Sequence, residues 1–141
     1  MKTPATSSLP PERLHWQAVL LGDPAAVTVE SLQQDYFTEA VNDVIHTISV
    51  DMGMRLFELN GEDGILSDAI NNGRFDILTA AESKGWKASF ALVHWTLLTV
   101  IEVFEEGPEK TGQTDQGLKD IVSWLRVRGL ITEEQVPDFC K

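Results

Sequence analysis

Apolar residues recur every three or four positions over most of the chain, which is the spacing of a helix with one buried face. The clearest example starts at residue 37. Its apolar positions are Phe37, Ala40, Val41, Val44 and Ile48. Just before it, Ser31 and Gln34 have the spacing of a capping box and indicate where this helix begins. The repeat fails after Ser49, which predicts a kink or a new helix between residues 49 and 53.

Other segments show the same kind of pattern. A helix is predicted over residues 12–21, and two short helices over residues 64–73 and 74–85 each end at a glycine. A longer helix is predicted from Thr114 to Gly129, with arginines in its last turn. No stretch of five or more residues alternates strictly between apolar and polar, so helices are expected throughout, with a small hairpin as the alternative.

Residues 86–105 form the most apolar of the predicted helices and leave almost no polar face. A helix that is apolar on all sides is buried on most of them. We therefore expect this segment to be the central helix of a bundle, to contact a second copy of the chain in a homodimer, or both. His94 is expected to be buried and bonded to a backbone carbonyl or a threonine. Trp95 and Trp124 are expected to lie in the core.

Together these patterns predict an all-α fold. We expect a single-domain compact helical bundle of about five to seven helices around the central apolar helix, residues 86–105. This domain spans residues 11–141, and residues 1–10, rich in Ser, Thr and Pro, are expected to be mobile. A chain of 141 residues buries enough surface for such a fold without a disulfide or a metal.

The charge balance is strongly acidic, with 11 Lys+Arg against 22 Asp+Glu and a net charge of -11. Direct binding to nucleic acid or to an anionic membrane needs clustered basic residues, so neither partner is expected. The first residues lack the apolar run of a secretory signal, and the longest apolar stretch is too short to span a membrane. The single cysteine, Cys140, forms no internal disulfide. A cytoplasmic location is the expectation.

The acids are concentrated in one part of the chain, because residues 14–73 contain ten acids and a single base, Arg55. Five of the acids are predicted to contact a partner: Asp35, Glu39, Asp43, Glu62 and Asp63. Asp35, Glu39 and Asp43 are four residues apart and would form one row on a helix. Like charges at this spacing cost a helix a few tenths of a kcal/mol each, so the fold alone gives no reason for the row. It is either a docking face for a basic partner or an ordinary solvated face.

Catalytic and cofactor motifs are absent from the sequence. There is no phosphate-binding glycine loop and no nucleophile elbow, so no catalytic residue and no cofactor are predicted. Glu39, Asp43 and His46 could approach one metal ion from a single helix face, but a second set of ligands is missing and no metal site is predicted.

Three classes of function remain. The leading hypothesis is a non-enzymatic interaction module that masks a basic partner protein by charge complementarity, as acidic inhibitors, immunity proteins, antitoxins and phage or mobile-element proteins that imitate DNA do. The first alternative is a homo-oligomeric accessory or chaperone-like subunit that uses residues 86–105 as its interface. The second is a small enzyme or small-molecule binder with a pocket between helices near His94.

Overall fold

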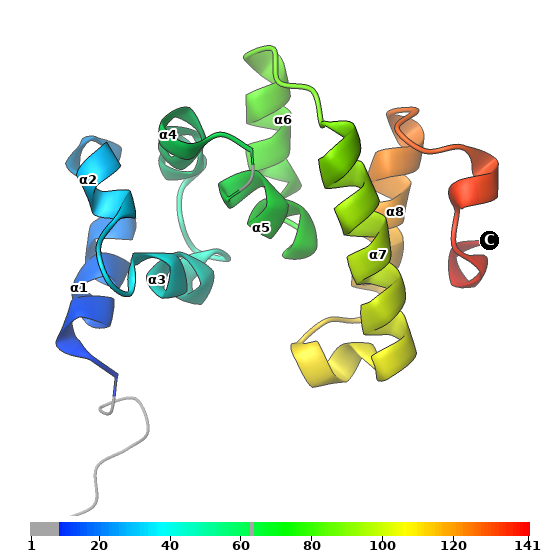
Figure 1. Cartoon of the computed structure of the whole chain (residues 1–141), viewed down its shortest axis with the longest axis horizontal. Helices are drawn as coiled ribbons and strands as arrows, with labels where there is room; N and C mark the ends of the chain where they lie inside the picture. Colours follow the sequence, from blue (N-terminus) through cyan, green and yellow to red (C-terminus); the bar gives the residue numbers. More distant parts are fainter. Residues whose placement is uncertain (1–8, 63) are drawn as a thin grey trace, which may run out of the picture. The chain divides into compact units, whose positions relative to one another are not determined.

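The computed structural model describes residues 9–62 and 64–141, which form eight α-helices and four short 3-10 turns and contain no strand (Figure 1). The all-α prediction is confirmed, with one helix more than the upper end of the expected number. The described residues divide into two compact units, residues 9–83 and 84–141. That residues 11–141 act as one domain stays a prediction, and most of the segment expected to be mobile, residues 1–8, lies outside the described residues.

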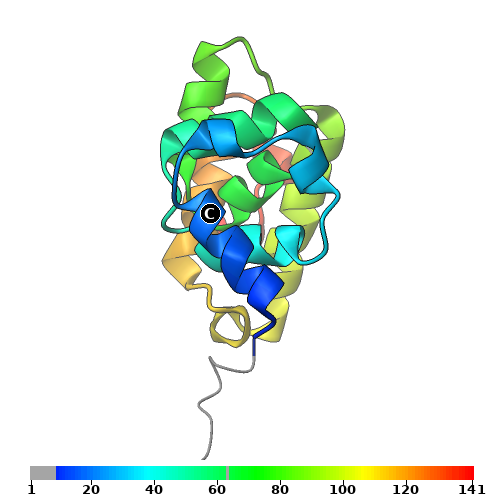
Figure 2. The same cartoon turned by 90° about the vertical axis from the view of Figure 1, so that its left-hand side faces the viewer.

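Six of the helices belong to the first unit. They are α1 (Pro11–Leu20), α2 (Val29–Leu32), α3 (Phe37–Val44), α4 (Val50–Asn60), α5 (Ile65–Asn71) and α6 (Phe75–Ser83), with a 3-10 turn, η2 (Pro24–Ala26), after α1. Helix α1 packs along α3 (Figure 1, Figure 2), and α4 packs against both α5 and α6. The largest fully buried side chains of this unit include no aromatic residue, and they are Leu20, Val27, Ile45, Ile48, Met52, Leu66, Ile70, Ile77 and Leu78.

The segment before residue 37 differs from its prediction. The expected helix start at Ser31 is wrong, because α2 already covers Val29–Leu32 and a separate helix begins at Phe37. Tyr36 stands between them with a φ of 69°, a left-handed conformation that interrupts a right-handed helix. The capping hydrogen bond is made one turn earlier than expected, from the Thr28 N–H to Ser31 Oγ at 3.0 Å. The predicted new start near residue 49 is confirmed, since Ser49 Oγ accepts from the Met52 N–H at the beginning of α4.

The second unit contains α7 (Phe90–Glu106) and α8 (Asp115–Val127), which pack against each other. Three 3-10 turns complete it: η3 (Pro108–Thr111), η4 (Glu133–Gln135) and η5 (Asp138–Cys140). Its buried side chains come from both helices and from the chain after α8, and they include Val100, Leu118, Ile121, Val122, Leu125, Ile131 and Val136.

Helix α7 begins at Phe90 and not at residue 86 as predicted. At this start, Ser89 Oγ accepts a hydrogen bond from the Leu92 N–H at 3.1 Å. The predictions of a buried His94 and a core Trp95 are wrong. His94 is exposed and stacks on the Phe90 ring, and Trp95 keeps 66% of its surface exposed. Thr96 is instead the buried polar residue of α7, with its hydroxyl donating to Leu92 O at 2.7 Å. Trp124 is buried as predicted.

Candidate functional site

The first unit carries most of the negative charge. Its described residues contain three arginines and no lysine against twelve acids. Whether this charge faces outward depends on where the arginines are bound, because each guanidinium could neutralise acids on the surface. The placement of these three cations therefore decides the electrostatics of the unit.

Arg13 joins α1 to α3 through Asp43. Its Nε and Nη2 atoms donate to the two carboxylate oxygens of Asp43 at 2.6 and 2.7 Å, and Gln17 Nε2 donates to the same carboxylate at 2.8 Å. Hydrogen bonds from Arg13 lower the pKa of Asp43 below its usual value and raise the pKa of Arg13. A bidentate pair of this kind fixes both position and orientation, so Asp43 holds two helices of its own unit together.

The other two arginines are also bound within the unit. Arg74 donates to both oxygens of Asp76, at 3.0 and 3.1 Å, and to the backbone oxygen of Ile45 at 2.7 Å. The hydrogen bonds from Arg74 lower the pKa of Asp76. Arg55 donates through Nε to the backbone oxygen of Val27 at 3.0 Å. Each described arginine of the unit therefore satisfies a backbone carbonyl or a neighbouring acid.

The five predicted contact acids lie in different environments, and the three that were expected to form one row, Asp35, Glu39 and Asp43, do not share one helix. Asp35 lies in the turn between α2 and α3, and Glu39 lies in the first turn of α3, both exposed. Asp43 is committed to Arg13. Glu62, half-buried in the loop between α4 and α5, has an interaction within the chain. Asp63 lies outside the described residues.

A different set of acids remains open to solvent. Seven exposed acids of the first unit make no ion pair within the described part of the chain. Two of them, Glu12 and Asp23, precede α2, and we call the remaining five the open acids: Glu30, Asp35, Glu39, Asp51 and Glu58. They come from α2, from the turn before α3, from α3 and from both ends of α4. Uncompensated carboxylates of one sign create a negative potential that reaches about 8–10 Å into physiological solution.

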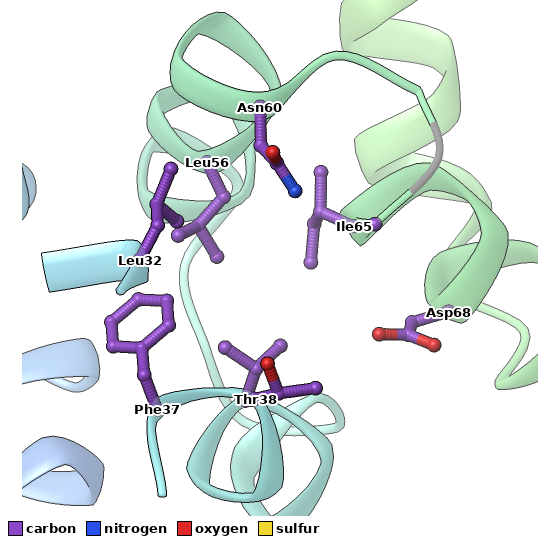
Figure 3. A pocket seen from close by; sticks show the side chains of 9 residues that line it. Leu32, Phe37, Thr38, Leu56, Asn60, Ile65 and Asp68 are labelled. Carbon is purple, nitrogen blue, oxygen red and sulfur yellow. The ribbon is translucent and has the colours of Figure 1, made fainter. Parts of the chain in front are cut away.

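The first unit also contains a pocket of about 120 Å³ between four of its helices (Figure 3). Its walls are mainly apolar, and its lining residues are Leu32, Phe37, Thr38, Val41, Leu56, Asn60, Gly64, Ile65 and Asp68. Figure 3 shows the Asn60 amide and the Asp68 carboxylate extending into the space between the helices. The sequence predicted a pocket near His94, which belongs to the second unit. The pocket described here lies in the first unit and is therefore a different one.

Asp68 is the ionisable residue of the pocket, and the sequence analysis did not identify it. Its carboxylate accepts no hydrogen bond and forms no ion pair within the described residues, and burial raises its pKa above the usual value. A signal was present in the sequence, because Asp68 stands between Leu66 and Ala69 and three residues after Ile65, all of them buried. A charged group at the edge of an apolar helix face finds a partner, keeps contact with water, or becomes neutral through a shift in its pKa.

The second unit has an exposed apolar face of a different kind. Phe90, Trp95 and Leu98 on α7 are 83%, 66% and 40% exposed. Exposed tryptophan and phenylalanine are enriched where proteins bind one another. This α7 face therefore provides a second candidate surface, with the exposed Glu102 and Glu105 on the same helix.

The residues considered as metal ligands are not brought together. His46 lies beyond the end of α3, so Glu39, Asp43 and His46 do not share one helix. Among residues 9–62 and 64–141, no group of three or more His, Cys, Asp or Glu side chains is placed to hold a metal ion. In the same residues, no helix has the length and apolar character that crossing a membrane requires.

Comparisons of the chain with protein-family models, with characterised proteins and with solved structures found no match.

Proposed function

We propose that the protein is a non-enzymatic interaction module of the inhibitor or immunity type, which masks a basic surface of another protein. The observation that supports this is that the basic and the acidic side chains of residues 9–83 have different environments. All three described arginines are bound within the unit, while the open acids are exposed and unpaired. The resulting field attracts a cationic surface and repels nucleic acid.

Charge of this kind acts mainly on the rate of encounter. Complementary potentials raise association rates by steering two proteins together, and salt weakens the effect because it screens exposed charges. Affinity then depends on what the surfaces bury after the encounter, and partly exposed apolar side chains of the same unit, Leu14, Leu21, Val29 and Tyr36, are available for that contact. Binding to the basic partner would block its surface by occupation, with no chemical step.

The test starts with the tagged protein as bait in lysate of the source organism at about 50 mM and about 500 mM NaCl. The captured protein is then expressed alone, and its association with the bait is measured by stopped-flow fluorescence. The key variant is Asp35→Asn/Glu39→Gln, which removes two open acids. Glu105→Gln/Glu106→Gln on α7 removes the same charge from the other unit and serves as the matched control.

The proposal predicts that the Asp35/Glu39 variant associates about three- to tenfold more slowly than wild type at low salt, and that the difference shrinks at high salt. The Glu105/Glu106 variant should lose less than half as much. Equal association rates for wild type and the Asp35/Glu39 variant would reject the docking role of these acids. Asp43→Asn is unsuitable as the key variant because it also breaks the bond to Arg13.

A second candidate function, self-association as an accessory subunit, is favoured by the α7 face. Phe90, Trp95 and Leu98 would be covered in a homodimer, which would remove large aromatic surface from water. If the bait captures only its own untagged copies, with no effect of salt, this candidate replaces the first. Trp95→Glu should then abolish the self-capture, whereas the Asp35/Glu39 variant should retain it.

A further inference from the structure

The pocket between α2, α3, α4 and α5 has the composition of a ligand site that the open acids do not use. Five of its lining side chains are apolar and come from three separate helices and the start of a fourth: Leu32, Phe37, Val41, Leu56 and Ile65. Walls of this kind favour a hydrocarbon segment and offer it nothing to hydrogen-bond. The part of a ligand that contacts these walls is therefore expected to be a hydrocarbon chain without polar groups.

The polar groups of the pocket specify the other end of that occupant. The Asp68 carboxylate extends into the pocket and has no donor within the described residues, and Thr38 and Asn60 line the same space (Figure 3). An ionised carboxylate accepts hydrogen bonds and cannot donate them. A ligand that satisfies Asp68 must therefore bring a donor to it.

The charge of the unit decides between a neutral and a cationic donor. Twelve acids against three arginines among the described residues of the first unit oppose the entry of an anion and favour a cation. A partly buried carboxylate without a partner is also the group that gains most from a positive charge. Burial raises the pKa of Asp68, and a cation beside it would lower that pKa again.

The volume of the pocket limits the size of the ligand. A protein cavity of about 150 Å³ can hold benzene, so a pocket of about 120 Å³ accepts a chain of roughly four to six non-hydrogen atoms. We propose that this pocket binds an alkylammonium group, with its hydrocarbon stem against Phe37, Leu56 and Ile65 and its ammonium group on Asp68. The group could be carried by a small free amine or by a lysine side chain of another protein, and the two sources share this chemistry.

The experiment follows the methyl signals of Val41, Leu56 and Ile65 by NMR in the full-length protein. The probes are n-butylammonium, n-butanol and n-butyrate, which differ in charge at nearly constant size. Butylammonium should give saturable shifts with a Kd in the millimolar range, as expected for a ligand of this size. Butanol should bind at least about tenfold more weakly, and butyrate should give no saturable shift.

Three variants separate the pocket from the general field of the unit. Asp68→Asn should weaken butylammonium about tenfold or more and leave butanol within about twofold, because only the charged contact is lost. Asp51→Asn removes an equal charge from an exposed position of the same unit and should change butylammonium binding by less than about twofold. Thr38→Met places a larger side chain at an exposed position on the rim and should reduce the binding of every probe.

A capped lysine, N-acetyl-lysine methylamide, then identifies the source of the group. Binding within about threefold of butylammonium assigns the pocket to a lysine side chain, and loss of binding assigns it to a small free amine. The proposal is overturned if butylammonium gives no saturable shift at these methyl groups, or if Asp68→Asn and Asp51→Asn weaken it equally. These probes need no partner protein, so either result leaves the proposal about the open acids to its own test.

Discussion

Acidic residues of the first unit have the same chemistry but three different environments. Asp43 and Asp76 are bonded to arginines, Asp68 is partly buried without a donor, and Asp35 is exposed. The pKa shifts follow these environments, downward where an arginine donates and upward where burial dominates. A count of charges along the sequence cannot separate the three groups.

The Asp43–Arg13 bond should make stability depend on pH in the acid range. Because the folded pKa of Asp43 is lowered, its contribution is fully present above the unfolded pKa of about 3.9 and is lost as the pH falls through the folded pKa. Asp43→Asn should therefore lower the Tm near pH 7, and the difference from wild type should narrow steadily below about pH 4. Thermal melts followed by circular dichroism measure both.

Two further variants test the cause of that effect. Arg13→Gln should reproduce the loss near neutral pH, since it removes the other half of the pair. Asp51→Asn, at an exposed acid without an ion pair, should show no such pH-dependent loss. An Asp43→Asn protein as stable as wild type near pH 7 would show that the bond does not stabilise the fold.

The sequence placed Asp43 with Asp35 and Glu39 because the three share a four-residue spacing. Spacing describes neighbours on one helix, whereas the partner of Asp43 is 30 residues away on α1. That contact exists only because α1 packs along α3. The acid row was predicted from residue spacing, but Asp35 lies in a turn before α3 and Asp43 is bound to Arg13 of α1.

At the scale of the helices, the spacing of apolar residues predicted which side chains are buried better than it predicted where one helix ends and the next begins. All five apolar positions of the repeat that starts at Phe37 are buried, including Ile48, which lies beyond the end of α3. The break at Tyr36 was missed because a left-handed residue leaves the hydrophobic pattern on either side unchanged. The same limit applies to α7, where apolar composition indicated a helix but could not tell which of its faces a neighbour covers.

The crossing of α4 and α6 depends on a position without a side chain. A Cβ atom at Gly53 would stand 2.8 Å from Ile77 Cδ1 and 3.0 Å from two other atoms of that side chain, and Ile77 is fully buried. Gly53→Ala should therefore destabilise the protein by about 1–3 kcal/mol, although alanine is the better helix former. Urea denaturation measures the change.

A second substitution tests whether the clash with Ile77 is the cause. Ile77→Val removes Cδ1 and should cost about 0.5–1.5 kcal/mol alone. In the Gly53→Ala background it should cost less, giving a coupling of at least about 0.5 kcal/mol. Additive effects of the two changes would mean that Gly53→Ala acts through something other than this contact.

For the molecule as a whole, repulsion among the excess acids lowers the free energy of unfolding, and the ion pairs of the fold do not offset it. The net charge is -11, and the open acids of the first unit have no ion pair within the described residues to offset their repulsion. A field that assists binding to a basic partner therefore opposes compactness in its absence. The composition alone predicted a negative field. Only the hydrogen bonds of the arginines show that these cations do not pair with the open acids.

That repulsion should appear as a response of stability to salt. Raising NaCl from about 20 mM to about 500 mM shortens the screening length from roughly 20 Å to roughly 4 Å and should raise the Tm. A gain on the order of 1 kcal/mol corresponds to about 2–8 °C. Asp35→Asn/Glu58→Gln should melt higher than wild type at low salt and gain less from added NaCl, because it starts with less repulsion. If the same variant melts lower than wild type at low salt, the open acids stabilise the fold, and their exposure then needs no partner to explain it.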